Sequence, residues 1–542
     1  MRDDCVYRLF PPLHLACFAA ACGWGQAPPG AEAEAPTPPA AAPTYDERYR
    51  PQYHFTPAVN WMNDPNGMFS YDGEYHLFYQ FNPFGDRWGH MSWGHAVTRD
   101  LVHWEHLPVA IPEADGVMAF SGSAVVDWNN TSGFGRNGQP PLVAIYTGHE
   151  EHKQSQYLAY STDRGRSWTV YDGNPVLDAG RKDFRDPKVF WYAPQERWVM
   201  AVALPDRHRI AFYASRNLED WTHLSDFGPA AAVGGIWECP DLFELPVDGD
   251  PNHTRWVLIV SLNPGSIAGG SGMQYFIGHF DGTRFVAEAP AAGVTSGGLP
   301  MESALWADYG KDFYAAVSWS DVPRDDGRRL WLGWMNNWSY AQEVPTGPWR
   351  GAMSLPRALS LRTTPRGLRL VQQPVAELQQ IRGPGRSLGT QDIAEGTTSL
   401  ASQGIAGTAL EIVAELEAGT AAEFGLKVRT GANEETLIGI DPKAGRLFVD
   451  RTRSGVTDFH PEFAGRRVAP APIEDGRVRL HVFVDWSSFE LFAGDGEIVM
   501  TEQIFPAPES DGVALYARGG TARLTMLEAW PLRPVWTARA GR

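Results

Sequence analysis

Residues 98–107 have the sequence TRDLVHWEHL, and the pattern returns as SRNLEDWTHL at residues 215–224. A weaker copy runs from Thr162 to Trp168, and in all three copies a hydroxyl residue precedes the tryptophan by six positions. A fourth, fainter copy, FDGTRF, has Phe285 in the tryptophan position. The four aromatic residues are 64, 53 and 64 positions apart. A period of about 60 residues is typical of one four-stranded β-propeller blade.

The stretch from residue 49 to residue 362 has room for five such blades. Short aromatic and β-branched runs alternate with Gly, Asp, Asn and Pro turns along it, among them EYHLFYQFN, RWVMAVAL and RLWLGWM. Runs of this length between turn residues predict strands. The chain also has 56 glycines and 42 prolines, which argues against a mainly helical protein. We therefore expect an all-β chain that begins with a five-bladed β-propeller.

The sequence changes character after TTPRG at residues 363–367. The blade pattern stops, and only Trp486, Trp530 and Trp536 remain of the 21 tryptophans. Strand-like runs such as LEIVAELE, FGLKVRT and VRLHVFVDW follow one another with turns between them. This spacing predicts a β-sandwich at residues 377–535, after a linker at 363–376 and before a tail at 536–542.

Composition excludes several classes of protein. Of the 542 residues, 43 % are apolar and 20 % are charged, as in ordinary globular proteins, so disordered and membrane-spanning classes are disfavoured. The 46 Lys and Arg against 64 Asp and Glu give a net charge of −18. That charge repels phosphate backbones, so we expect no nucleic-acid partner. The sequence does not indicate an oligomeric state.

The first 22 residues predict a signal peptide. A short apolar run follows a weakly basic start, too short to span a membrane but long enough for export. The segment AAACG resembles a lipoprotein cleavage box, so two outcomes stay open: lipidation of Cys22, which would tether the protein to a membrane, or ordinary cleavage. Residues 23–48 are rich in Pro and Ala and predict a linker. We expect a secreted protein, or a periplasmic or cell-surface lipoprotein.

Three carboxylates stand out by their surroundings: Asp64 in WMNDPNG, Asp186 in RDP and Glu238 in ECP. A proline follows each within two residues, and for the two aspartates it directly favours extended backbone. The spacings of 122 and 52 residues correspond to two blades and one blade. Because the innermost strands of a propeller converge on a central channel, we expect the three acids to share one pocket.

Clustered carboxylates suit the cleavage of a glycosidic bond, in which one group donates a proton and another acts as nucleophile or base. Proximity and burial separate their pKa values, so that one stays protonated while another is ionised. The residues alone do not assign these roles. Each acid beside a proline can also be a simple turn former. Three acids can hold a hard cation, but no Asp-x-Asp-x-Asp loop or His pair accompanies them, so we expect no metal and no cofactor.

WMNDPNG, FSGS (residues 120–123), RDP and ECP, in this order, resemble glycoside hydrolase family 32, the invertases, inulinases and levanases that act on β-fructofuranosides. The likeness extends from about residue 50 to residue 535. It implies a five-bladed propeller followed by a β-sandwich, in agreement with the repeat count. It also implies that the substrate is a fructan or sucrose.

The resemblance implies roles for individual residues. Asp64 would be the nucleophile, Glu238 the general acid and base, and Asp186 the stabiliser of the transition state. Polar contacts to the sugar would come from Asn63, Gln80, Ser121 and Arg185, and the apolar wall from Trp61, Trp88, Phe120 and Trp334. The buried thiol of Cys239 is expected to pack behind Glu238.

These observations predict a retaining exo-β-fructosidase that releases terminal fructose from levan, inulin and sucrose. Two alternatives remain open. A fructosyltransferase would use the same acids but pass the fructosyl unit to a sugar instead of water. A non-catalytic sugar-binding propeller would bind the same ligands and release no sugar.

Overall fold

The computed structural model describes residues 43–288 and 304–536. The predicted signal peptide at 1–22 with Cys22, most of the predicted linker at 23–48 and the tail after Trp536 lie outside these ranges. Strands dominate the described residues. The short 3₁₀ helices among them are η1 (Ala193–Gln195), η2 (Pro205–Arg207), η4 (Ala376–Ile381) and η5 (Ala401–Gln403). No helix in residues 43–288 and 304–536 has the length and apolarity that a membrane crossing needs.

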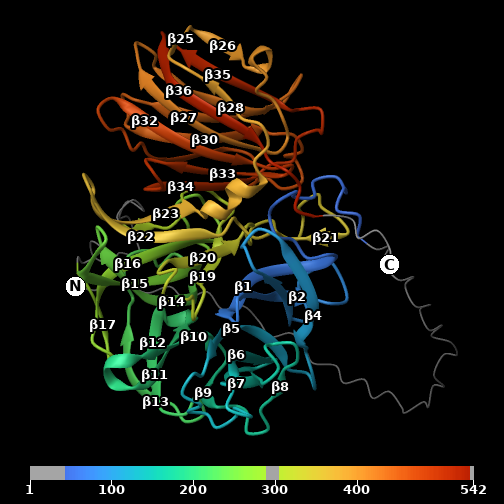
Figure 1. Cartoon of the computed structure of the whole chain (residues 1–542), viewed down its shortest axis with the longest axis vertical. Helices are drawn as coiled ribbons and strands as arrows, with labels where there is room; N and C mark the ends of the chain where they lie inside the picture. Colours follow the sequence, from blue (N-terminus) through green and yellow to red (C-terminus); the bar gives the residue numbers. More distant parts are fainter. Residues whose placement is uncertain (1–42, 289–303, 537–542) are drawn as a thin grey trace, which may run out of the picture. The chain divides into compact units, whose positions relative to one another are not determined.

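The first part of the chain forms five antiparallel blades, which confirms the predicted propeller (Figure 1). The first three comprise β1 (Asn60–Tyr71), β2 (Glu74–Asn82), β3 (Ser92–Thr98) and β4 (Trp104–Ile111); β5 (Met118–Val126), β6 (Leu142–Glu150), β7 (Lys153–Ser161) and β8 (Thr169–Val170), with β9 (Leu177–Arg181) also on β7; and β10 (Arg185–Tyr192), β11 (Arg197–Leu204), β12 (Arg209–Ser215) and β13 (Thr222–Phe227).

Blades four and five join into one sheet through a single parallel pair, Val247 with Leu361. Their strands are β14 (Ile236–Val247), β15 (Asp250–Asn263), β16 (Gly272–Phe280) and β17 (Phe285–Ala287), with β18 (Leu305–Trp306) on β16; and β19 (Tyr314–Ser318), β20 (Arg329–Trp334), β22 (Arg357–Thr364) and β23 (Gly367–Pro374). The short strand β21 (Trp349–Arg350) returns to pair in parallel with β1 of the first blade.

The innermost strand of each blade contacts the innermost strand of the next. These strands are β1, β5, β10, β14 and β19, and because β19 also contacts β1 they close a ring. Each inner strand therefore faces a common axis, as the sequence predicts for residues a whole number of blades apart.

The repeated aromatic residue marks the outermost strand in four of the five blades. Trp104 begins β4, Trp168 and Trp221 come directly before β8 and β13, and Phe285 begins β17. A side-chain turn precedes each tryptophan. In the first blade, Asp100 Oδ1 accepts hydrogen bonds from the backbone N–H groups of residues 102 and 103, at 3.0 and 2.8 Å. The repeat is thus a turn that starts the last strand of a blade.

The second blade differs from the sequence prediction by one residue. Ser161, not Thr162, donates to the turn residue Asp163, at 2.7 Å, as Thr98 and Ser215 do to the turn residues of their own blades. This turn holds one extra residue, so the matching hydroxyl lies seven positions before Trp168.

The propeller extends further than the sequence predicts. Residues 363–374, assigned above to a linker, complete β22 and form β23, which pairs with β22 along its whole length. TTPRG is therefore a hairpin turn inside the fifth blade. Only η4 lies between that blade and the second domain.

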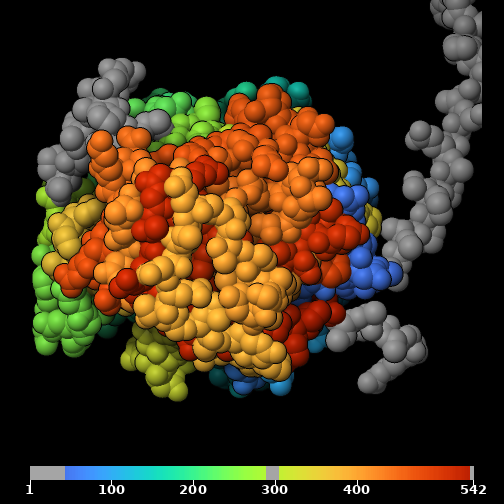
Figure 2. Space-filling model, turned by 90° about the horizontal axis from the view of Figure 1, so that it is seen from above, coloured from blue at the N-terminus to red at the C-terminus, as the bar shows by residue number. Residues whose placement is uncertain are grey.

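The second domain is a sandwich of two antiparallel sheets, and its outer surface is seen in Figure 2. An aliphatic core fills the space between the sheets. One sheet has β24 (Arg386–Leu388), β36 (Ala522–Pro531), β27 (Leu410–Ala418), β32 (Arg477–Val484), β33 (Ser488–Ala493) and β34 (Ile498–Gln503), with β25 (Gln391–Ile393); the other has β26 (Gly396–Ser399), β35 (Gly512–Arg518), β28 (Glu423–Thr430), β29 (Glu435–Asp441), β30 (Arg446–Arg453) and β31 (Arg466–Pro470).

Buried ion pairs join the propeller to the sandwich. Arg357 of β22 donates to Glu490 of β33 at 2.6 Å and also reaches Asp308 at 3.3 Å, and all three side chains are inaccessible or nearly so. Arg451 of the sandwich pairs in the same way with Asp312 of the propeller at 2.5 Å. Because a buried charge without a partner is costly, these pairs fix how the two domains meet.

Replacement of Arg357 tests this interface. In Arg357→Met the carboxylate of Asp308 loses its buried cation and Glu490 keeps only His54, so we expect the free energy of unfolding to fall by about 3–5 kcal/mol. The matched control is Arg453→Met, which removes a guanidinium that is 57 % exposed from its pair with Glu435 and should cost about 1 kcal/mol or less. Urea denaturation measures both, and equal losses would contradict the role given to Arg357.

Candidate active site

All five inner strands are bulged at corresponding positions. Bulges interrupt strand pairing and redirect side chains, and they are common beside active sites. Every carboxylate singled out in the sequence lies at one of these register shifts. The shifts fall between Met62 and Pro65 in β1, Ala119 and Gly122 in β5, Arg185 and Lys188 in β10, Glu238 and Asp241 in β14, and Tyr314 and Val317 in β19.

The backbone is strained at three of the bulges. Asp186, Cys239 and Ala315 have φ values of 65°, 44° and 54°, in the left-handed region that costs a residue with a Cβ about 1–2 kcal/mol. The extended backbone expected for Asp186 from its proline is therefore wrong: the bulge overrides that local preference. The proline instead suits a bulge because it has no N–H to donate to the ladder.

Asp64 lies in β1 and is almost fully buried. Its Oδ2 accepts a hydrogen bond from Ser121 Oγ at 2.8 Å, and the thiol of Cys239 lies 3.6 Å from the same oxygen. Its Oδ1 has no hydrogen-bond partner among the described residues. Burial, reinforced by the nearby charge of Glu238, raises the pKa of Asp64 to about 6.

Asp186 and Asp64 both contact Cys239. Its Oδ2 accepts the backbone N–H of Cys239 at 2.9 Å, and the Cys239 sulfur lies 3.5 Å away. The backbone N–H of Asp186 donates to Thr147 Oγ1 at 3.0 Å, which fixes the bulge. Burial raises the pKa of Asp186 to about 7 although the positive charge of Arg185 lowers it. The Cys239 thiol thus faces the two aspartates instead of packing behind Glu238.

Glu238 is held by donors on both oxygens. Arg185 Nε and Nη2 donate to Oε1 at 3.0 and 2.9 Å, and the hydroxyl of Tyr314 donates to Oε2. Arg185 is itself fixed by Asp183 at 2.9 Å and Gln154 at 3.2 Å. The Glu238 side chain keeps 16 % of its surface exposed, more than either aspartate, so it lies nearest to solvent.

An aromatic cluster forms the wall beside the acids. Trp61 and Trp334 are fully buried with ring centres 6.0 Å apart, and the Trp61 indole donates to Asn63 Oδ1 at 2.8 Å. Phe120 packs against this cluster. Trp88 is 40 % exposed, and its ring lies 6.0 Å from that of Phe120, so it forms an outer rim.

Gln80 hydrogen-bonds to the backbone, whereas Ser121 and Arg185 hydrogen-bond to the acids. Its amide donates to the backbone oxygen of Ala119 at 3.0 Å, where the bulge of β5 begins. This hydrogen bond is with the strand that presents Ser121, not with a carboxylate.

Sequence reasoning missed Tyr314, Asp183 and Gln154. Tyr314 begins the inner strand of the fifth blade, 76 residues after Glu238, and the blade period was the only signal that could have located it. Asp183 and Gln154 act through Arg185, and no motif marks such supporting residues.

A small hollow of about 10 Å³ lies beside the aspartates, lined by Ser121, Asp186, Cys239 and Lys188 among others. Lys188 is held in place on its lining, because its ammonium donates to the backbone oxygen of Ser318 at 2.6 Å and lies 3.4 Å from Asp241. Within the described residues, no group of three or more His, Cys, Asp or Glu side chains is arranged to hold a metal ion.

Comparison with known proteins identifies the relatives of this chain. Residues 54–374 match the model of the glycosyl hydrolases family 32 N-terminal domain, and residues 377–531 match that of the family 32 C-terminal domain. A levanase of Bacillus subtilis (strain 168) is 54 % identical over 497 residues, which cover 91 % of this chain and 72 % of the levanase. An extracellular exo-inulinase of Aspergillus awamori is 43 % identical, with 91 % and 96 % covered.

Solved structures agree. The crystal structure of the exo-inulinase from Aspergillus awamori has a TM-score of 0.84 at 41 % identity, and the alignment covers 91 % of this chain and all of that one. A β-fructofuranosidase from Schwanniomyces occidentalis in complex with fructosyl-erythritol has a TM-score of 0.81 at 31 % identity, with 91 % and 99 % covered.

The raised pKa of Asp64 predicts that its charge destabilises the fold. The pKa of an unfolded aspartate is about 3.9, so stability falls as the pH rises above that value and through about 6. Asp64→Asn should therefore raise the free energy of unfolding by about 1–3 kcal/mol at pH 8 and leave it nearly unchanged at pH 4. Denaturation of both proteins at the two pH values measures this, and a gain of the same size at pH 4 would contradict the assignment.

Proposed function

The chain belongs to glycosyl hydrolase family 32, and from this premise we propose that it is a retaining exo-β-fructosidase. Its substrates would be levan, inulin and sucrose, from which it releases terminal β-D-fructofuranosyl units. The observation that carries the proposal is the convergence of Asp64, Asp186 and Glu238 from blades one, three and four on one end of the ring.

Asp64 is proposed as the nucleophile. One of its oxygens is held by Ser121, while the other has no hydrogen-bond partner among the described residues. That free oxygen can attack the anomeric C2 of a terminal fructosyl unit. The C2–O bond to the rest of the substrate breaks, and a fructosyl ester of Asp64 forms.

Glu238 is proposed as the general acid and base. In the first step its carboxyl gives its proton to the leaving oxygen as the C2–O bond breaks. In the second step the resulting carboxylate takes a proton from water, which attacks C2 and releases Asp64. Two inversions at C2 give net retention. The retaining geometry needs the two carboxyls about 5–5.5 Å apart, and the position of Cys239, next to Glu238 in sequence and against Asp64 in space, supports their proximity.

Asp186 is proposed to stabilise the oxocarbenium-like transition state and to bind sugar hydroxyls. Asn63, Gln80, Ser121 and Arg185 are proposed to support or contact the hydroxyls. Trp61, Phe120, Trp334 and the more exposed Trp88 are proposed to form the apolar wall. Each buried donor or acceptor that loses its partner would cost about 1–3 kcal/mol, which gives such a site its selectivity.

The small hollow beside the aspartates supports exo-action. At about 10 Å³ it has no room for a sugar unit, and Lys188, which lines it, is held by an ion pair with Asp241. Only a chain end can reach the carboxylates in a site of this kind. Terminal fructose is therefore the expected product from a fructan.

Export is proposed as well. The predicted leader at residues 1–22 supports it, and one relative is named as an extracellular exo-inulinase. Acylation of Cys22 would keep the protein at the membrane surface. If the unaltered protein is found in the membrane fraction and the Cys22→Ser variant in the soluble fraction, the tether is supported. The same distribution of both proteins between the two fractions would contradict it.

Product analysis on levan, inulin and sucrose tests the proposed function. We expect free fructose from all three as the first product. Asp64→Ala should lower kcat by at least about 10⁴-fold, and Glu238→Ala by about 10²–10⁴-fold. Asp206→Ala, which removes an exposed carboxylate of η2, should retain full activity. A ladder of oligomers from levan would contradict exo-action, and predominant chain growth would show a transferase.

The pH dependence tests the role of Ser121. The acid limb of kcat/KM reports the carboxylate that must be ionised in the free enzyme, so it should lie near the Asp64 value of about 6. The Ser121 hydrogen bond favours the charged form. Its loss in Ser121→Ala should therefore move the acid limb to higher pH.

Ser123→Ala is the matched control. Ser123 lies two residues further along β5, and its hydroxyl donates to the backbone of Pro187 instead of a carboxylate. The acid limb of this variant should coincide with that of the unaltered protein. An acid limb that moves to lower pH in Ser121→Ala would contradict the account.

A further inference from the structure

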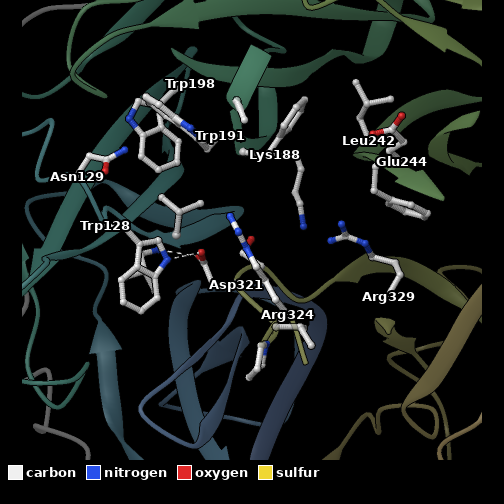
Figure 3. A pocket seen from close by; sticks show the side chains of 18 of the residues that line it. Trp128, Asn129, Lys188, Trp191, Trp198, Leu242, Glu244, Asp321, Arg324 and Arg329 are labelled. Atoms are coloured by element: carbon white, nitrogen blue, oxygen red, sulfur yellow. Dashed lines mark hydrogen bonds between the residues drawn. The ribbon is translucent and has the colours of Figure 1, made fainter. Parts of the chain in front are cut away.

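A second cavity lies at the other end of the inner strands. It has a volume of about 690 Å³ and is lined from blades two to five (Figure 3). Asp186 lies near the start of β10, whereas Phe190, four residues further along the same strand, lines this cavity. At about 3.3 Å per residue the two sites are separated by roughly 13 Å of strand. The mechanism proposed above does not use this cavity.

Three cations point into this cavity. Figure 3 shows the head groups of Lys188, Arg324 and Arg329 extending into the same hollow. They gather there although the chain has a net charge of −18. Like charges that converge in a partly desolvated space raise the free energy unless an anion compensates them.

Arg324 is exposed to solvent, and of the other two cations Arg329 is the less compensated. Its one hydrogen bond within the described residues runs from Nη1 to the backbone oxygen of Trp319, at 3.3 Å, and its guanidinium packs over the ring of Phe243. No ion pair to it is found in residues 43–288 and 304–536. Lys188, by contrast, has the backbone of Ser318 and the carboxylate of Asp241. Arg329 therefore keeps several N–H donors for a ligand.

Two acids that attract Arg329, Asp321 and Asp241, already have other partners. Asp321 accepts the backbone N–H of Val126 and the indole N–H of Trp128, both at 2.9 Å. Asp241 accepts the backbone N–H of Ser318 at 2.6 Å. Both attract Arg329 electrostatically, but neither lies within ion-pair distance of it. Asp321 and Asp241 lower the free-energy cost of burying Arg329, but they do not take the place of an anion bound to its N–H groups.

Aromatic faces make up much of the remaining wall. Trp128 is 60 % exposed, and its hydrogen bond to Asp321 fixes the plane of its ring. Trp191, Trp256 and Phe190 also line the cavity. Flat faces of this kind pack against rings, while Asn129 and the carboxylate of Glu244 can accept hydrogen bonds from hydroxyl groups.

We propose that this cavity binds an anionic sugar, a uronate or a sugar phosphate. Its anionic group would lie against Arg329, with Lys188 and Arg324 nearby, and its ring would pack on Trp128. A volume of about 690 Å³ lies within the usual range of small-molecule sites, about 300–1,000 Å³. The inference does not depend on the chemistry proposed for the acids.

Titration calorimetry on the full chain tests the proposal, with glucuronate, glucose 6-phosphate, inorganic phosphate and neutral glucose as probes. At least one of the two anionic sugars should bind at least tenfold more tightly than glucose or inorganic phosphate. Glucose that binds as tightly would contradict the role of the cations. Inorganic phosphate that binds as tightly would contradict the role of the aromatic wall.

Variants locate the binding. Arg329→Gln and Trp128→Ala should each weaken binding of the anionic sugar at least tenfold, and Arg329→Lys should restore part of the loss from Arg329→Gln. The matched control Arg216→Gln removes an exposed charge outside the cavity and should leave binding unchanged. Far-UV circular dichroism and urea denaturation of each variant show that it is folded. Equal affinity of Arg329→Gln, Trp128→Ala and the unaltered chain would overturn the assignment, as would the absence of any binding.

Discussion

The site depends on one constraint of the backbone: five inner strands must close a ring while each carries a bulge. Closure makes β1, β5, β10, β14 and β19 neighbours in a circle, and the bulges turn residues of successive blades toward the same end of the axis. The strained residues Asp186 and Cys239 are tolerated because hydrogen bonds from neighbouring strands hold them in place. A site built this way is rigid before any substrate arrives, which limits the cost of ordering it.

The buried Glu490 at the domain junction and the buried aspartates of the ring have opposite pKa shifts. At the junction of propeller and sandwich, Glu490 has Arg357 and His54 as partners, and its pKa is lowered despite burial. At the end of the ring, Arg185 is the one guanidinium among the described residues that hydrogen-bonds to an acid of the site, and it pairs with Glu238. Burial raises the pKa values of Asp64 and Asp186. The partners of Glu490 favour its charged form in the folded protein, whereas ionisation of Asp64 and Asp186 lowers the stability of the fold.

Much of the fold was predictable because the blade turn leaves a mark in sequence. The outer strands begin at Trp104 and directly after Trp168 and Trp221, and the spacing of these residues predicts the number of blades. Pro65, Pro187 and Pro240 mark three bulges, so the acids beside them were found. The register was harder: TTPRG resembles a linker but is a hairpin turn, because its pairing partner is not local. Tyr314 and the second cavity escaped notice, since both are assembled only when distant strands close the ring.

The most direct test of the proposed mechanism is to trap the covalent bond between Asp64 and the fructosyl unit. Glu238→Ala would be mixed with an aryl β-fructofuranoside, whose leaving group needs no proton, and quenched with acid during turnover. Mass spectrometry of the peptides should find a fructosyl ester on Asp64, because the base that would release it is missing. An unmodified Asp64 during steady turnover, or a sugar attached to Asp186 instead, would contradict the account.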